Sequence, residues 1–254
     1  MVDGNGFIEL MGQLHLDFLN TPKLFLNQTN IQIKLHKNSD NFCLLNNADG
    51  YKIQFLSVKA RVRHQIISND IINAHNNVLM KHSAYYLIKK TDVTSRLVHI
   101  AGSKAESYTI STGLVPNIVI LAFIKPEATI GTKNTNPFNF EHHNIKSIEL
   151  KVGSKQLPYT HLLEFDFNKN LYMDGYMTLY DIVGKPDNGN NISREDYGIT
   201  LNCGNDFINL GKSAPVTVTI YFNDNKDTPS SLDMITYLEY NSGIEINNLR
   251  QILQ

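Results

Sequence analysis

The sequence predicts an all-β fold of antiparallel strands with one or two short helices in the connections. Segments of alternating or continuous apolar residues recur along the whole chain. Clusters of Asn, Gly, Asp and Pro, which favour turns, separate these segments. Helical spacing of apolar residues is confined to two stretches. Many short strands with few helices indicate a β-sandwich or a jelly roll.

The predicted strands differ in how they bury their side chains. Residues 31–35 (Ile-Gln-Ile-Lys-Leu) alternate strictly, which is typical of a half-buried antiparallel strand. Residues 118–124 are nearly all apolar and predict a strand covered on both faces. Residues 51–64 form the longest extended candidate. The other predicted strands are 14–18, 42–45, 84–88, 95–100, 145–152, 198–202, 216–222 and 234–239.

Two stretches have the spacing of short helices, at 70–81 and 168–180. The positions that carry this spacing are Ile71, Ala74, His75, Val78 and Leu79 in the first stretch, and Leu171, Met173, Tyr176, Met177, Leu179 and Tyr180 in the second. Residues 46–50 (Asn-Asn-Ala-Asp-Gly) predict a tight turn, and 184–191 predict an exposed loop. Both helices therefore fall in connections between strands.

The composition is that of an ordinary soluble globular protein. Hydrophobic residues make up 42% of the 254 residues, and the formal net charge is −1. This charge gives no bulk attraction to nucleic acid, so we expect any contact with nucleic acid to be indirect at most. Cys43 and Cys203 lack metal-ligand spacing and suit a reducing compartment. The chain shows no signal-peptide pattern, and its longest apolar run is too short for membrane insertion. The sequence therefore predicts a soluble intracellular protein.

The residues that could carry chemistry do not form a recognisable active site. His142 and His143 follow Glu141, but neighbouring side chains on a strand point to opposite faces and cannot reach one metal ion. The chain has no HExxH helix motif, no GxSxG elbow and no phosphate-binding glycine loop. We therefore expect no catalytic residues, no metal and no cofactor.

A basic stripe and two loops are the candidate contact surfaces. Lys59, Arg61 and Arg63, with Lys52, fit either contact with nucleic acid or an acidic partner, or the solvated face of an amphipathic strand. The near-neutral net charge favours the solvated face. The loop at 136–140 (Asn-Pro-Phe-Asn-Phe) predicts a turn whose rings pack into the core or against a neighbour, with the core favoured. The loop around 191–198 is a surface connection or a subunit contact. The candidate contact residues are Asn136, Pro137, Phe138, Asn139, Phe140, Arg194 and Tyr197.

A set of motifs, in order along nearly the whole chain, resembles a known protein family. They are GQLHLDF, LFLNQTNIQIKLHKNSDNFCLL, YKIQFLSVKARVRH, INAHNNVLMKHSAYY, TGLVPNIVILAFI, TNPFNFEHHNIKSIELKVGSKQLP, NNISREDYGITL and TYLEYNSGIEINNLR. Together they resemble the capsid proteins of Polinton (Maverick) elements and the related adintoviruses. The resemblance is most specific at the 136–140 loop and the strand after it.

The resemblance implies a double jelly-roll major capsid protein. In that family two eight-stranded jelly rolls lie side by side, and three subunits form a pseudo-hexagonal capsomer of an icosahedral shell. The family offers no catalytic residues to carry over. The implied partners are other copies of the chain, as a homotrimer, and a minor capsid protein. The implied location is the virion, with synthesis inside the host cell.

The chain departs from the family pattern at its N-terminal end. Family members are longer, and a complete jelly roll should precede GQLHLDF, where this sequence has about a dozen residues. The expected division is therefore 1–45, resembling the closing strands of a first roll, and 46–254, forming the second. The early strands would then lack partners and leave open edges. A milder departure is TGLVPN, which stands where the family tends to have a GQLPK-like loop.

The sequence thus favours a structural protein that self-assembles as a jelly-roll capsid subunit. The alternative is a jelly-roll binding module for carbohydrate or a receptor, including a truncated or domesticated capsid remnant. Without tryptophan, its exposed aromatic platforms would be Tyr85, Tyr86, Tyr159 and Tyr197. A third and weaker hypothesis is a cupin-like enzyme with a metal inside the barrel.

Overall fold

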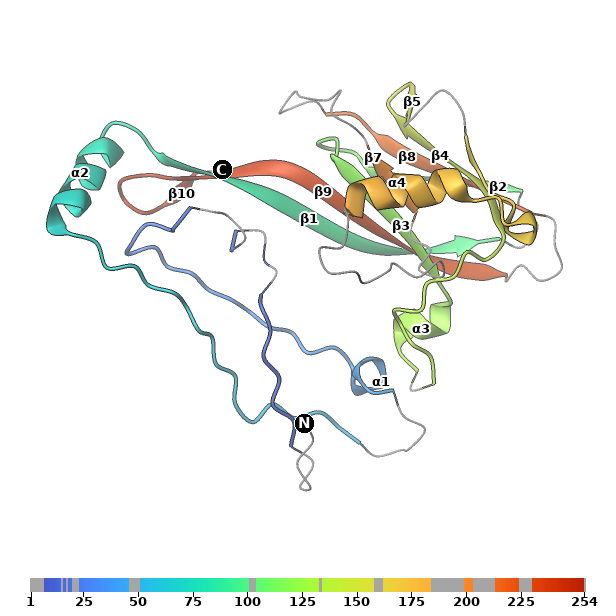
Figure 1. Cartoon of the computed structure of the whole chain (residues 1–254), viewed down its shortest axis with the longest axis horizontal. Coiled ribbons are helices and arrows are strands. Elements are labelled where there is room, and N and C mark those ends of the chain that lie inside the picture. The colour runs from blue at the N-terminus through green and yellow to red at the C-terminus, as the bar shows by residue number, and fades with distance from the viewer. Residues whose placement is uncertain are drawn as a thin grey trace. The chain divides into compact units, whose positions relative to one another are not determined.

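A computed structural model describes most of the chain. The described residues are 7–14, 16, 18–19, 23–45, 51–100, 104–132, 134–157, 162–183, 199–202, 213–223 and 230–253. The helices are α1 (Asp40–Cys43), α2 (Asn69–Leu79), α3 (Pro126–Ile130), the 3-10 helix η1 (Phe167–Lys169) and α4 (Met173–Val183). The strands are β1 (Ala84–His99), β2 (Ala105–Ser111), β3 (Ile118–Ile124), β4 (Ile145–Val152), β5 (Lys155–Leu157), β6 (Leu163–Glu164), β7 (Ile199–Asn202), β8 (Val216–Phe222), β9 (Ser231–Ile246) and β10 (Ile252–Leu253). Figure 1 labels all of these elements except η1 and β6.

The strands form two antiparallel sheets whose order is that of a jelly roll (Figure 1). One sheet has the order β1-β9-β3-β7, and the other has the order β2-β8-β4-β5. Strand β10 joins the first sheet beside β9, and β6 joins the second beside β4. The chain changes sheet between β1 and β2, β2 and β3, β3 and β4, and again at each step from β6 to β9. This repeated crossing is the double Greek key of a jelly roll. The predicted fold class is therefore confirmed.

The core lies between the two sheets and follows the alternation of the strands. In β8, four alternate side chains are buried, from Val216 to Phe222. Strand β4 shifts its register between Ile145 and Ser147, so Ile145 and Ile148 both point into the core. A β-bulge of this kind changes which side chains face inward. Strand alternation and the β-bulge in β4 together determine which side chains face the core.

Strand β3 has the double coverage that its apolar sequence predicts. Val119, Leu121 and Phe123 belong to the core between the sheets. Ala122 and Ile124, which point to the opposite face, are buried as well. A strand buried on both faces has no polar side to show, which explains the continuous apolar run.

The described chain divides into two compact units. Unit 1 comprises Met1–Ile31, Gln65–Lys90 and Asn241–Gln254, and unit 2 comprises Gln32–His64 and Thr91–Tyr240. In unit 1, the Phe25 ring stacks on Tyr86, and the Tyr86 hydroxyl donates a hydrogen bond to the Leu24 carbonyl. The division expected from the family resemblance, at 45/46, remains a prediction.

Three of the predicted strands are wrong, and all three lie in the first quarter of the chain. Residues 31–35 and 51–64 contain no strand, and 42–45 overlap α1. Residues 14–18 lie partly outside the described residues. An extended segment becomes a strand only where a neighbouring backbone accepts its hydrogen bonds, and the described residues provide none for these segments. Farther on, the separately predicted 84–88 and 95–100 merge into β1.

The two predicted helices are confirmed with shifted ends, as α2 and α4. Two shorter helices, α1 and α3, join them. Among the described residues, no helix combines the length and apolar character needed to cross a membrane.

Candidate assembly surface

Helix α4 is fixed to the jelly roll through one of its faces. Gly175 lies against Phe165, and a Cβ atom at Gly175 would fall 2.5 Å from the Phe165 ring. Leu179, one turn further along, is buried. The Phe165 ring in turn stacks on Phe167. Glycine therefore allows the close approach of α4 to this aromatic cluster, and the helix lies beside β7 (Figure 1).

The opposite face of α4 is apolar and exposed. Met173 and Met177 are 63% and 46% exposed, and Leu171 just before the helix is 62% exposed. At 100° per residue, Met173 and Met177 lie on the side of the helix away from Gly175. A helix that is apolar on both sides is normally covered on both sides. This outer face is therefore the first candidate contact surface.

The 136–140 loop is an ordered turn. The Asn136 side-chain oxygen accepts a hydrogen bond from the Phe138 amide at 3.0 Å, and the Asn136 carbonyl accepts one from Asn139 at 3.2 Å. The Asn139 side-chain amide donates to Glu141. Pro137 is buried and Phe140 is half-buried. Phe138, by contrast, is 69% exposed, so the favoured packing of both rings into the core is wrong for Phe138.

Phe138 meets the N-terminal part of its own chain instead. Its ring makes an edge-on contact with Phe42 of α1, with ring centroids 6.1 Å apart. Gly131, which ends α3, has a φ of +89° and lies so close to α1 that a Cβ atom there would be 2.8 Å from the Phe42 backbone. Helix α1 is therefore docked on the turn after α3 and on the Phe138 loop.

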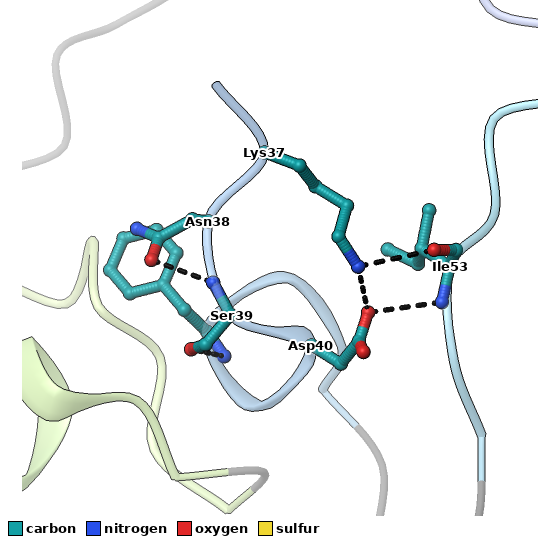
Figure 2. Close-up of polar contacts among 6 residues, drawn as sticks. Lys37, Asn38, Ser39, Asp40 and Ile53 are labelled. Carbon is teal, nitrogen blue, oxygen red and sulfur yellow. Dashed lines mark hydrogen bonds and ion pairs between the residues drawn. The ribbon is translucent and has the colours of Figure 1, made fainter.

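A cluster of polar contacts links α1 to the segment that follows it, as Figure 2 shows. The Asp40 carboxylate pairs with the Lys37 ammonium group and accepts a hydrogen bond from the Ile53 amide at 3.0 Å. Lys37 also donates to the Ile53 carbonyl at 3.1 Å. The hydrogen bond from Lys37 and then that from Ile53 hold the pKa of Asp40 below its usual 3.8. Ser39 caps the helix by accepting a bond from the Phe42 amide.

Away from this cluster the segment is uncovered. We use the name arm for the described residues of 32–64, which belong to unit 2. Within the arm, half-burial is confined to Asp40, Phe42, Leu44 and Ile53. The apolar side chains Phe55, Leu56, Val58 and Val62 are each more than 60% exposed. Lys59, Arg61 and Arg63 are exposed as well, on a segment that pairs with no strand among the described residues.

The two neighbouring histidines have separate environments. The His142 ring stacks on Phe167 at 4.0 Å, and its Nδ1 accepts a hydrogen bond from the Asn144 amide. His143 lies in a left-handed backbone conformation with φ of 45°, and its Nδ1 is 3.8 Å from the Glu141 carboxylate. Burial lowers the pKa of both rings. Among the described residues no group of three or more His, Cys, Asp or Glu side chains is placed to hold a metal ion.

The tyrosines considered as sugar platforms are only partly suited to that role. Tyr86 is buried and stacked on Phe25, so its ring face is not available. Tyr85 is 45% exposed and packs its hydroxyl end against Gly243. Tyr159, Tyr197, Arg194 and the loop at 184–197 lie outside the described residues, as does Cys203.

Sequence reasoning overlooked α1 and its docking site. The predicted strand 42–45 overlaps α1, and no helix is predicted at Asp40. The available signal was Ser39 followed by Asp40, a helix cap with an acidic first turn. Gly131 after the apolar end of α3 was a second signal, since glycine favours the positive φ found there.

Comparison with protein-family models finds no match for this chain. "Uncharacterized protein F54H12.2" of Caenorhabditis elegans is 21% identical over 266 aligned residues, which include 97% of this chain and 63% of the relative. The chain therefore spans less than two thirds of that relative.

Among solved structures, the chain is similar to "PBCV-1 virus capsid, quasi-atomic model", with 8% identity and a TM-score of 0.42. That alignment covers 72% of this chain and 54% of the capsid chain. It is also similar to "Crystal structure of mavirus major capsid protein", with 12% identity, a TM-score of 0.38, and coverage of 68% and 41%. At these scores the jelly-roll assignment rests on the strand order described above.

Proposed function

We propose that this protein is a structural, non-enzymatic subunit that self-associates, as a jelly-roll capsid protein does. The observation that carries the proposal is the contrast within unit 2 between a closed core and an uncovered arm. The core between the sheets is fully formed. The arm exposes apolar side chains that a protein acting as a monomer would normally bury.

The finer proposal follows the motif resemblance. The protein belongs with the major capsid proteins of Polinton elements and adintoviruses, forms a homotrimer, and is part of a virion together with a minor capsid protein. In this proposal residues 1–45 correspond to the closing strands of a first jelly roll, and 46–254 correspond to the second. Two mainly apolar surfaces support self-association, namely the arm and the outer face of α4.

The 136–140 loop has a place in this proposal as an anchor for α1. Phe138 contacts Phe42 within the chain and still leaves most of its ring exposed. It can therefore hold the arm and meet a neighbouring subunit with the remaining surface. Asn136, Pro137, Asn139 and Phe140 shape the turn that presents it.

Light-scattering mass after size exclusion, measured over a wide range of protein concentration, tests the proposal. We expect a species of three times the 28.8 kDa chain mass whose population grows with concentration. A monomer at every concentration, with the jelly roll intact by circular dichroism, would contradict self-association. A stable dimer would keep self-association and overturn the trimer.

A further inference from the structure

Two uncovered surfaces of unit 2 match each other in chemical character. The first is the arm segment 51–64. The second is the outer face of α4 with the turn that leads into it, within residues 163–183. Each surface has exposed apolar side chains beside charged ones, and the charges have opposite sign.

The charge difference is local and clear. Residues 51–64 carry four basic side chains and no acidic one, which gives a net charge of +4. Among the side chains that the structure describes in residues 163–183, three are acidic and one is a lysine, which gives −2. That lysine, Lys169, is already paired with Asp166. Glu164 and Asp174 are exposed and remain oriented toward solvent. Opposite potentials of this kind guide two surfaces into one register.

The apolar side chains are also complementary. The arm offers Phe55, Leu56, Val58 and Val62, each more than 60% exposed. The α4 surface offers Leu171, Met173 and Met177. Methionine side chains adapt their shape to an incoming ring or branched chain. Covering these groups removes apolar area from water on both surfaces, which drives association.

We propose that residues 51–64 of one copy dock on the outer face of α4 of a second copy. The inference rests on the proposed self-association and names the two surfaces that carry it. Both surfaces stay exposed in the structure of a single chain, so the contact is available to another copy. The Asp40–Ile53 hydrogen bond holds the start of the segment on its own jelly roll. Beyond it, residues 54–64 span about 35 Å when extended, before the chain continues towards α2.

The geometry of such a contact has a consequence for the oligomer. The arm and α4 are different surfaces, so the interface is heterologous. Each copy gives its arm to the next copy and receives an arm from the previous one. A heterologous contact that closes produces a ring with cyclic symmetry, and a three-membered ring is the trimer proposed above.

Charge reversal on each surface tests the proposal by light-scattering mass. The arm variant carries Lys59→Glu, Arg61→Glu and Arg63→Glu, and the α4 variant carries Glu164→Lys and Asp174→Lys. We expect each to raise the dissociation constant of the oligomer by about tenfold, because exposed ion pairs are weak singly and several are inverted together. The chain with both sets of changes has opposite charges on the two surfaces again, so it should associate more tightly than either single-surface variant.

A matched control separates a specific contact from a general effect of charge. Lys81→Glu, Lys125→Glu and Lys146→Glu change exposed lysines outside the arm and α4, and they shift the net charge by the same amount as the arm variant. This control should associate like the wild type. Circular dichroism of every variant confirms the folded state. Raising the salt concentration should weaken the wild-type oligomer and reduce the difference in dissociation constant between the wild type and the variants.

The outcomes separate this inference from the proposal beneath it. A wild-type oligomer that neither reversal weakens overturns the arm-to-α4 contact and leaves self-association standing. An oligomer weakened by the arm variant alone overturns α4 as the docking face. A combined variant that fails to associate overturns direct pairing of the two surfaces. A wild type that is monomeric at every concentration overturns both proposals.

Discussion

Strand β8 and residues 31–35 have nearly the same sequence pattern and different structures. Both alternate apolar and polar residues. In β8 the apolar side chains are buried, because β2 and β4 pair with it on either side. In 31–35 the apolar side chains are exposed and the backbone has no strand partner among the described residues. Alternation therefore specifies which side chains share a face, whereas a neighbouring backbone decides whether a sheet forms.

The sharpest test of this contrast truncates one β-branched side chain to alanine in each region. Ile220 in β8 has no exposed surface, whereas Val62 in the arm is 70% exposed. We expect Ile220→Ala to lower the free energy of unfolding by about 2–5 kcal/mol, because it leaves a cavity between the sheets. Val62→Ala should change it by less than about 0.5 kcal/mol. Urea unfolding followed by circular dichroism measures both.

The comparison requires a concentration at which the protein is monomeric. If Val62→Ala destabilised that monomer by as much as Ile220→Ala, the arm would be part of the folded core and the contrast would be wrong. At higher concentration, Val62→Ala should instead weaken the oligomer.

The next largest effect lies where the arm meets the jelly roll. Gly131→Ala places a Cβ atom 2.8 Å from the Phe42 backbone at a φ of +89°. We expect a loss of about 1–3 kcal/mol from strain and overpacking, together with release of α1. Fluorescence of a dye on the exposed Cys43 should report that release.

Gly153→Ala is the matched control for Gly131→Ala. Gly153 also has a positive φ, of 61°, but its Cβ atom would meet Ala214 only at 4.0 Å. Its substitution should therefore cost strain without moving α1. A dye response as large in Gly153→Ala as in Gly131→Ala would show that the signal does not come from the α1 contact.

The jelly-roll strands were the part of the fold that the sequence predicted best. The bounds of β3, β4 and β8 agree with the predicted 118–124, 145–152 and 216–222. These strands lie inside their sheets, where burial imposes a regular apolar pattern on each face. After β4 the chain turns at Gly153, whose φ of 61° is a backbone conformation that glycine favours.

The candidate surface was harder to predict because its contacts depend on partners rather than on periodicity. Phe138 and Phe140 look alike in sequence, yet Phe140 is half-buried and Phe138 meets Phe42 from a distant segment. The local sequence indicates that an aromatic ring packs against another side chain, but it does not identify that side chain. Prediction from sequence fails in the arm for the same reason. Its alternating residues predict strands, but the described residues contain no strand that pairs with them.

A smaller effect should appear as a pH dependence of the jelly roll. Burial holds the pKa of His143 below its usual 6.5, with Glu141 raising it and Lys125 and His142 lowering it. The folded state then binds fewer protons than the unfolded state just below pH 6.5, so stability falls as pH decreases through that range. The urea midpoint should therefore be lower at pH 5.5 than at pH 7.5.

His143→Gln isolates this contribution, since glutamine does not titrate in that range. The variant should lose part of the difference between the two midpoints. His142→Gln provides a comparison, because burial lowers the pKa of His142 as well and its ring stacks on Phe167. An unchanged pH difference in both variants would show that each histidine has the same pKa in the folded and unfolded states.

The smallest expected effect concerns the hold of the arm on its own jelly roll. Asp40→Asn removes the ion pair with Lys37 and weakens the acceptor for the Ile53 amide. Because Asp40 lies at the surface, we expect a change in global stability of less than about 0.5 kcal/mol. Hydrogen exchange should nevertheless become faster at the Ile53 amide and in α1 while the amides of β8 stay protected. Ser39→Ala is the companion variant, since it removes the α1 cap and leaves the Asp40 contacts in place. If Asp40→Asn left exchange at Ile53 unchanged, the polar cluster would not hold the arm, and Phe42 against Gly131 and Phe138 would be its remaining anchor.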